Sequence, residues 1–395
     1  MNHPIYLDYN ATTPVDPAVC ETMLPYFREN FGNSSSVSHQ YGFIAEKAVM
    51  TARRQVADLI GAEAKEIIWT SGATESNNLA IKGIAEKYRD KGNHIITCQT
   101  EHKAVLDVCS YLELSGYEVT CLPVDSQGMI DPDQLRKSIT DKTILISFMA
   151  ANNETGVIHP IEEIGNIAHE KEVFFHCDAT QAVGKIPIDV KSMNIDLLSL
   201  SAHKIYGPKG IGVLYVRDRN PRVRPAPIIH GGGHENDMRS GTLNVPGIAG
   251  IGRACEICKD TINHEPERLN NLAEKLYQGI ISQLDHVILN GHPEKRLGHV
   301  LNLTFGYVEG EALMLAMPDV AVSSGSACTS ASLETSYVLR AMGISDDYAN
   351  SSLRFSLGRF TTEKEINSAI GCVASAVNRL REMSPLYEKI IQKHL

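Results

Sequence analysis

Long apolar runs and excess positive charge are both missing from this sequence of 395 residues. Its most apolar segment, ILISFMAA at 144–151, is far shorter than the ~20 residues that span a bilayer, so we expect no membrane association. The N-terminus lacks the cationic and apolar regions of a signal peptide. Lys and Arg number 37 against 47 Asp and Glu, and the resulting net charge of −10 argues against direct nucleic-acid binding.

A disulfide framework is also missing. The nine cysteines are odd in number and irregularly spaced in a long chain, which is typical of reduced thiols and predicts a cytoplasmic protein. Cys255 and Cys258 form a C-x-x-C pair, but no second pair accompanies them, so no metal site is predicted there. No Walker-type loop, H-E-x-x-H or G-x-S-x-G motif occurs, which removes the commonest signatures of nucleotide, zinc and serine-hydrolase chemistry.

Hydrophobic periodicity predicts an α/β fold. Apolar strands are expected at 66–70, 94–98, 117–124, 143–149, 173–178 and 196–201, and helices alternate with them. That alternation predicts a mostly parallel sheet covered by helices on both faces. After about residue 260, longer helical stretches at 266–284 and 363–382 surround a strand at 299–305. We therefore expect a large domain at 15–260 and a smaller α/β domain formed by 1–14 and 261–395.

A lysine follows the strand at 196–201. In DLLSLSAHKIYGPKGIG, Lys204 comes just after a buried strand, where partial desolvation lowers the pKa of an amine and lets it form a Schiff base. The alternative is a surface lysine in a loop. The neighbouring Ser, His and Gly residues can cradle an anion, which favours the functional interpretation.

Other polar residues also follow predicted strands. Asp178 ends VFFHCD, where a carboxylate can hold a proton on a heteroaromatic nitrogen, although it can equally cap a helix. The segment SGATESNN at 71–78 opens a helix whose N-terminus favours phosphate, with simple capping as the alternative. His102 is a candidate catalytic residue, because it can stack on a planar cofactor or shuttle protons, with a structural role as the alternative. Because parallel strands end at one edge of a sheet, these residues should converge.

Cys328 and Arg354 are the remaining candidates. Cys328 lies in SSGSACTSAS, a run of small residues that favours exposure and reactivity, whereas Cys177 and Cys372 have the apolar neighbours of core positions. Arg354 lies inside an apolar, strand-like run, where it can hold a substrate carboxylate or form a structural ion pair.

The chain resembles the cysteine desulfurases of the NifS/IscS family. These belong to the class V aminotransferase group of fold-type I enzymes, which use pyridoxal phosphate. The resemblance covers essentially the whole chain and rests on long segments: LDYNATTPVDP (7–17), FGNSSSVSHQYG (31–42), TSGATESNN (70–78), TEHKAVLD (100–107), NNETGVIHPIEEIG (152–165), DATQAVGKIPID (178–189), SAHKIYGPKGIGVLYVR (201–217), HGGGHENDMRSGTLNVP (230–246), SSGSACTSAS (323–332) and SSLRFSLGRFTTEKEI (351–366). It implies a seven-stranded sheet in the large domain and a Cys328 loop in the smaller one.

The resemblance also implies residue roles. Lys204 matches the lysine that binds the cofactor, and Cys328 matches the thiol that accepts sulfur. The cofactor contacts are implied to be Asp178 at the pyridine nitrogen, Gln181 at the ring hydroxyl, His102 against the ring, Asn153, and a phosphate cradle of Ala73, Thr74, Ser201 and His203, with Thr242 reaching in from a partner subunit. Asn153 and Arg354 match the substrate-carboxylate contacts. No firm metal ligand is implied, although Cys328 can transiently bind an iron–sulfur cluster.

The implied activity is removal of sulfur from L-cysteine. The products are L-alanine and a persulfide on Cys328, which a homodimer passes to an iron–sulfur scaffold or another sulfur-acceptor protein. The alternatives on the same scaffold are a selenocysteine lyase and a class V aminotransferase, and the Cys328 loop argues against the aminotransferase because transamination needs no thiol. A sulfur-relay protein with a dormant site is a further alternative, which the intact Lys204 and Asp178 oppose.

Overall fold

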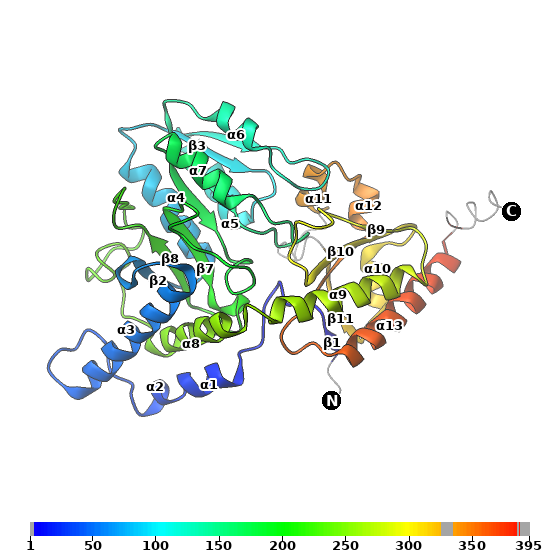
Figure 1. Cartoon of the computed structure of the whole chain (residues 1–395), viewed down its shortest axis with the longest axis horizontal. Helices are drawn as coiled ribbons and strands as arrows, with labels where there is room; N and C mark the ends of the chain where they lie inside the picture. The colour runs from blue at the N-terminus through cyan, green and yellow to red at the C-terminus, as the bar shows by residue number, and fades with distance from the viewer. Residues whose placement is uncertain (1–3, 325–334, 385–386, 388–395) are drawn as a thin grey trace.

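The computed structural model describes residues 4–324, 335–384 and 387 (Figure 1). Within these residues seven strands form one sheet, whose parallel part confirms the predicted fold class. Its order is β2 (Ile67–Thr70), β8 (Gly212–Val216), β7 (Leu197–Ser201), β6 (Phe174–Asp178), β5 (Thr143–Met149), β3 (His94–Cys98) and β4 (Glu118–Leu122). Neighbours from β7 to β4 run parallel, whereas β8 is antiparallel to both β7 and β2.

Helices cover both faces of this sheet. On one face lie α3 (Gln40–Ile60), α7 (Ile161–Glu170) and α8 (Val245–Thr261), and on the other α4 (Ala73–Lys87) and α5 (Lys103–Leu114). Neighbouring side chains of a strand point to opposite faces, so Ile95 of β3 packs with α4 and α5 while Ile96 packs with the other layer. Every residue of β5 is buried, as its continuous apolar sequence predicts.

A second sheet lies beside the first (Figure 1). It is antiparallel, with the order β12 (Ser323–Ser324), β13 (Ser352–Ser356), β10 (Val300–Phe305) and β9 (Val287–Leu289). The helices α9 (Glu265–Ile281), α10 (Gly310–Ala316) and α13 (Glu363–Glu382) form a separate apolar core with it. The N-terminal strand β1 (Ile5–Tyr6) joins this region by pairing with β11 (Val320–Ala321). We propose that the domains follow these cores, at 15–260 and at 1–14 with 261–395.

Local sequence explains where several helices begin and end. α3 stops at Gly61, whose left-handed φ of 72° suits glycine. α13 begins with a capping box in which the Thr362 and Glu365 side chains each bind the other's backbone amide.

The shorter elements are α1 (Pro17–Met23), α2 (Pro25–Arg28), η1 (Ala64–Glu66), α6 (Pro132–Ser138), η2 (Ala202–Lys204), α11 (Tyr337–Ala341) and α12 (Asp346–Asn350).

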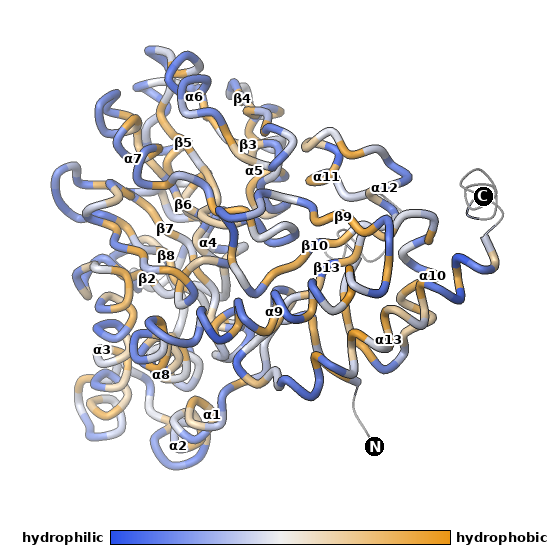
Figure 2. The backbone as a smooth tube through the Cα atoms, turned by 45° about the vertical axis from the view of Figure 1, so that its right-hand side comes forward, coloured by the Kyte–Doolittle hydropathy of each residue, from blue (hydrophilic) through white to orange (hydrophobic). Residues whose placement is uncertain are grey.

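Apolar residues gather in the interior of both regions. In Figure 2 strands of both sheets are drawn largely in orange, whereas the loops around them are mostly blue. None of the helices in the described ranges combines the length and the apolar character that crossing a membrane requires.

Candidate active site

A cavity of about 560 Å³ opens where the carboxyl ends of the large sheet's parallel strands meet the smaller sheet. Ligand sites of open α/β sheets lie at this edge. The structure brings most of the predicted site residues together here: Ala73, Thr74, His102, Asn153, Asp178, Gln181, Ser201, His203, Lys204 and Arg354 all line the cavity. They come from segments spread over nearly 300 residues of sequence, which the sheet topology assembles at one edge.

Asp178 is a buried carboxylate at the end of β6. Its side chain accepts hydrogen bonds from the Asn77 amide at 2.7 Å and from the Thr180 backbone N–H at 3.0 Å. Asn77 lies on α4, so the helix that begins beside the cavity also orients this carboxylate. The arrangement holds a negative charge in place beside a cavity, as a residue that protonates a ring nitrogen requires.

Lys204 ends the short helix η2 directly after β7. Its amine donates to the backbone carbonyl of Ala11 at 2.8 Å and also to that of Asn10. The same Asn10 carbonyl accepts from the Gln181 amide at 3.0 Å, and the Lys185 amine donates to the Gln181 side-chain oxygen at 2.9 Å. The N-terminal segment therefore holds the predicted cofactor lysine and Gln181 in one hydrogen-bonded group.

The N-terminus of α4 provides an anion site. The helix begins at Ala73 after Gly72, and Gly72 has no side chain with which to cap the first amides. Free N–H groups and the positive end of the helix dipole favour a phosphate at this point. His203 lies across the cavity and is neutral at neutral pH, because burial first and Lys204 second lower its pKa to about 4. It can therefore bind an anion as a hydrogen-bond donor rather than as a cation.

Arg354 reaches the cavity from β13 of the smaller sheet. It forms the ion pair that the sequence left as an alternative, with Asp8 at 2.7 Å, and it also donates to the Asn153 carbonyl at 2.9 Å. Its Nε has no partner among the described residues although it is buried. The structural ion pair and the predicted substrate-binding position therefore coexist in one residue.

The residues present fit pyridoxal phosphate. Buried polar atoms that lack a partner in the described part of the chain cluster around the cavity: Asn10 Oδ1, Asn153 Oδ1, Thr180 Oγ1 and Arg354 Nε. Native proteins rarely leave such atoms unsatisfied, so their clustering indicates a polar ligand. A carboxylate, an amine and an uncapped helix N-terminus supply partners for the ring nitrogen, the carbonyl group and the phosphate of this cofactor.

Two predicted site residues are left untested. Cys328 lies outside the described residues, which resume at 335 after ending at 324. Thr242 is exposed and absent from the cavity lining, and its proposed role belongs to a second subunit. Both assignments therefore stay predictions.

The described cysteines fall into two groups. Cys98, Cys109, Cys177, Cys255 and Cys258 are buried, and burial raises the pKa of each thiol above its usual range. Such thiols are poor nucleophiles, because the thiolate is the reactive form. Cys20 and Cys121 are exposed and Cys372 is half-buried. No cluster of three or more His, Cys, Asp or Glu side chains in the described ranges is arranged to hold a metal ion.

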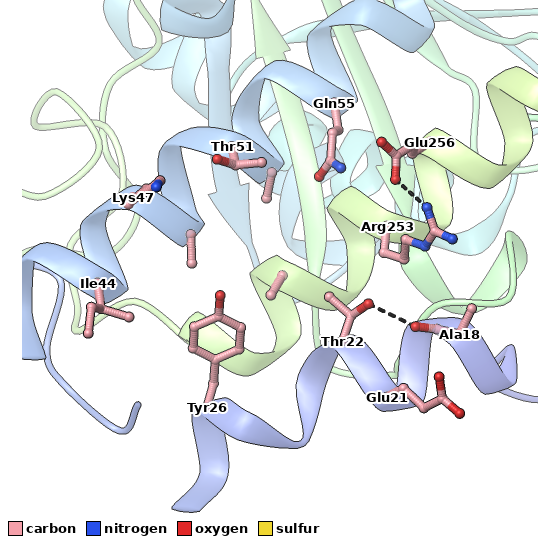
Figure 3. Close-up of a pocket in the computed structure, with 13 residues that line it drawn as sticks. Ala18, Glu21, Thr22, Tyr26, Ile44, Lys47, Thr51, Gln55, Arg253 and Glu256 are labelled. Carbon is pink, nitrogen blue, oxygen red and sulfur yellow. Dashed lines mark hydrogen bonds and ion pairs between the residues drawn. The ribbon is translucent and has the colours of Figure 1, made fainter. Parts of the chain in front are cut away.

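A larger cavity, of about 790 Å³, lies between α1, α3 and α8 (Figure 3). Its lining includes Tyr26, Lys47 and Arg253, and Arg253 is paired with Glu256. It contains none of the predicted site residues and none of the unpartnered buried atoms described above. We therefore assign the active site to the smaller cavity, since chemistry depends on the groups present rather than on volume.

Sequence reasoning missed several residues of the site. Asn10 and Asn77 lie within LDYNATTPVDP and TSGATESNN, two of the segments that carry the family resemblance, but the sequence assigns neither of them a role. Asn10 lies 194 positions from Lys204 and Asn77 lies 101 positions from Asp178, so only the folded structure reveals these contacts. The signal that could have found them was their position in polar segments that precede or open predicted elements.

Comparisons with known proteins agree on one family. The sequence profile of the family "Aminotransferase class-V" matches residues 5–368. "Cysteine desulfurase IscS" of Anaeromyxobacter sp. (strain Fw109-5) is 60% identical over 390 residues, covering 99% of this chain and 96% of that protein. The solved structure of a "NifS-like protein" has a TM-score of 0.89 and 37% identity, covering 95% of this chain and 99% of that one. A second, "SspA in complex with cysteine", has a TM-score of 0.80 and 40% identity, with coverages of 90% and 99%.

Proposed function

Because the chain belongs to the class V aminotransferase family and is a pyridoxal-phosphate-dependent cysteine desulfurase, we propose specific roles for the residues around its cavity. Full-length relatives that carry the desulfurase name favour this activity over selenocysteine lyase and aminotransferase activities. The observation that carries the proposed roles is that Lys204, Asp178 and Arg354, from three different strands or strand ends, line one cavity.

The chain's own residues divide the work between proton transfer and binding. When bound, pyridoxal phosphate supplies an electron sink for the charge left at the substrate Cα. The Lys204 amine accepts the Cα proton, and the Asp178 carboxylate keeps a proton on the ring nitrogen. His102 covers the ring, Gln181 meets its hydroxyl, and the amides of Ala73 and Thr74 bind the phosphate together with Ser201 and His203.

The substrate is held from the other side of the cavity. Arg354 and Asn153 bind the carboxylate of L-cysteine, Arg354 through its unpartnered Nε–H and Asn153 through its side-chain amide N–H groups. The Cys328 thiolate takes the substrate sulfur atom, forming a sulfur–sulfur bond as the carbon–sulfur bond breaks, and L-alanine is released.

The proposal for Cys328 is tested by a single substitution. In C328S, we expect the visible absorbance of the bound cofactor to be retained and alanine formation from L-cysteine to fall to background, because the sulfur has no acceptor. Alanine formation at the unmodified rate in C328S would contradict the role of this thiol. Amine transfer that depends on added keto acid would instead indicate an aminotransferase.

We also propose that the protein works as a homodimer. An exposed apolar surface supports this, since Phe27, Phe31, Val37, Tyr41 and Phe43 gather on α2, the following loop and the start of α3 with half or more of each side chain exposed. Large exposed apolar patches usually mark interfaces. A second subunit would also place Thr242 at the phosphate. Sedimentation equilibrium that returned the mass of one chain would contradict this proposal.

The persulfide is proposed to pass to an acceptor protein in the cytoplasm, either an iron–sulfur scaffold or another sulfur carrier. The name of the relatives supports a sulfur-donating role. The eight described cysteines are all free thiols, as expected in a reducing compartment. Trapping a mixed disulfide between Cys328 and a cytoplasmic protein is the test. Recovery of the chain only in an oxidising compartment would oppose it.

A further inference from the structure

The chain on both sides of the Cys328-bearing segment is attached beside the active-site cavity. Before the segment, β12 pairs with β13, and Ser323 lies opposite Arg354 in that ladder. After it, the Ser336 hydroxyl donates to the Glu154 carboxylate, with 2.6 Å between Oγ and Oε2. Glu154 is next in sequence to Asn153, which lines the cavity.

The attachment after the segment involves the start of helix α11. Ser336 caps this helix by accepting a hydrogen bond from the Leu339 backbone N–H at 3.2 Å. The next residue, Tyr337, donates its hydroxyl to the Glu101 carbonyl at 2.7 Å, and the Lys103 amine lies 4.9 Å from the centre of its ring. Figures 1 and 2 both show α11 beside α5, which begins at Lys103.

Glu154 is unusual because it is an ionisable residue in a buried position. Its side chain is buried, with 3% of the residue exposed, and an ionised carboxylate is costly to bury without partners. Within the described ranges, the hydrogen bond that its carboxylate receives comes from Ser336. Burial raises the pKa of Glu154 to about 7, while the Ser336 hydrogen bond, Arg354 and His102 oppose that rise.

The contacts of Glu154 join the large sheet to the chain that comes from the smaller sheet. Glu154 lies in the loop after β5, on the large sheet, whereas Ser336 belongs to the chain that returns from the smaller sheet. Arg354 and His102, which act on Glu154 electrostatically, are a proposed substrate contact and a proposed cofactor contact. A residue whose role was only to fill space would not need a charge here, because an apolar side chain packs without desolvation cost.

We propose that Glu154 is a positioning residue for sulfur transfer, holding Ser336 and thereby the downstream end of the Cys328 segment against the active-site layer. This inference rests on the proposed role of Cys328 as the sulfur acceptor. Glu154 contacts neither substrate nor cofactor in this account. It acts through Ser336, so its loss should slow transfer of sulfur to Cys328 while leaving cofactor and substrate binding intact.

The test compares Glu154→Gln, Ser336→Ala and the double variant as cofactor-loaded enzymes, in buffer alkaline enough to ionise Glu154. We expect the single-turnover rate of Cys328 persulfide formation to fall about tenfold in each single variant, the size of one charge-assisted hydrogen bond. The double variant should lose much less than the product of the two single losses, because Glu154→Gln removes the charge from the same hydrogen bond whose donor Ser336→Ala removes. Ser336→Thr keeps a hydroxyl at this position, so its rate of persulfide formation should stay close to that of the unmodified enzyme, unlike that of Ser336→Ala.

Three further measurements separate a positioning role from a general loss of folding or cofactor binding. The visible absorbance of the cofactor and the KM for L-cysteine should be unchanged, and the rate at which iodoacetamide alkylates Cys328 without substrate should change in both single variants. Ser345→Ala is the matched control, because Ser345 precedes α12 as Ser336 precedes α11 but makes no side-chain capping bond. It should behave like the unmodified enzyme in every assay.

Several results would overturn the inference. An unmodified persulfide rate in E154Q would do so, as would multiplicative losses in the double variant. So would a parallel loss of cofactor absorbance, which would indicate a structural role. Failure of the proposed function is distinguishable, because the unmodified enzyme would then form no persulfide on Cys328 while the alkylation rates of the variants would still differ from it.

Discussion

The two sheets contribute different kinds of residue to the cavity. The large sheet supplies Asp178 and Lys204 from the ends of buried parallel strands, where neighbouring backbone and side-chain groups hold each of them. The smaller sheet supplies Arg354 from within β13 and, through β12, the chain that leads to Cys328. In the proposed roles, most cofactor contacts therefore belong to the large sheet, whereas Arg354 and the sulfur acceptor belong to the smaller region. The difference predicts that substitutions in the two regions fail in different ways.

The largest expected effect lies on the large sheet. Lys204→Ala should lower turnover by about 10³-fold or more, because it removes the base at Cα. Borohydride treatment should also no longer attach the cofactor covalently to the chain. Peptide mapping after reduction is the measurement, and Lys209→Ala is the control, because Lys209 lines the same cavity and should leave the attachment intact. Attachment that survives in K204A would remove this lysine from its role.

An intermediate effect is expected on the smaller sheet. Arg354→Lys keeps a positive charge but loses the two-pronged geometry that suits a carboxylate, so the KM for L-cysteine should rise about tenfold. The absorbance of the bound cofactor should not change, in contrast to K204A. Steady-state kinetics and an absorption spectrum check both points.

The control for Arg354 is Arg359→Lys. Arg359 is another largely buried arginine, paired with Asp16 and Glu265, but it does not line the cavity. The KM of R359K for L-cysteine should stay near that of the unmodified enzyme. If R354K and R359K raise KM equally, substrate binding does not depend on the cavity position of Arg354, and the comparison between the sheets fails.

The smallest expected effect concerns acid stability. His159, between β5 and α7, is 2% exposed, and burial lowers its pKa from 6.5 to about 4. Between these values the unfolded chain binds a proton that the folded chain does not, so stability is lost as pH falls from 6.5 towards 4. This residue should contribute a loss of about 2 kcal/mol in the free energy of unfolding between pH 8 and pH 5.

His159→Gln should therefore flatten the pH dependence of urea unfolding. The matched control is His286→Gln, beside β9 of the smaller sheet, because the His286 side chain is 42% exposed. It should keep the slope of the unmodified protein. Equal slopes for H159Q and the unmodified protein would show that His159 takes up its proton in the folded state as readily as in the unfolded one.

Local structure was largely predictable from the sequence. The predicted strand at 143–149 and the predicted helix at 363–382 have the observed bounds, because apolar periodicity and capping residues act over a few positions. The convergence of polar residues at strand ends was also predictable, because parallel strands end at one edge. Nearly all the proposed cofactor contacts in the described residues lie there.

The rest depends on packing between distant segments. Asn77 faces Asp178 because of the way that α4 packs on the sheet, and no local pattern in the sequence encodes this packing. The sequence left Arg354 with two alternatives. The structure shows the ion pair, because folding brings Asp8 to Arg354 across 346 positions, and the substrate contact stays a prediction. The proposed role of Thr242 involves a second chain, so the fold of one chain does not test it.

The most direct test of this account is the location of the transferred sulfur. After one equivalent of L-cysteine reacts with the cofactor-loaded enzyme, the thiols are alkylated and the peptides are analysed by mass spectrometry. The account predicts one extra sulfur atom on the peptide that contains Cys328, and none on the peptides of the exposed Cys20 and Cys121. An extra sulfur on another cysteine, or alanine released with no protein-bound sulfur, would contradict it.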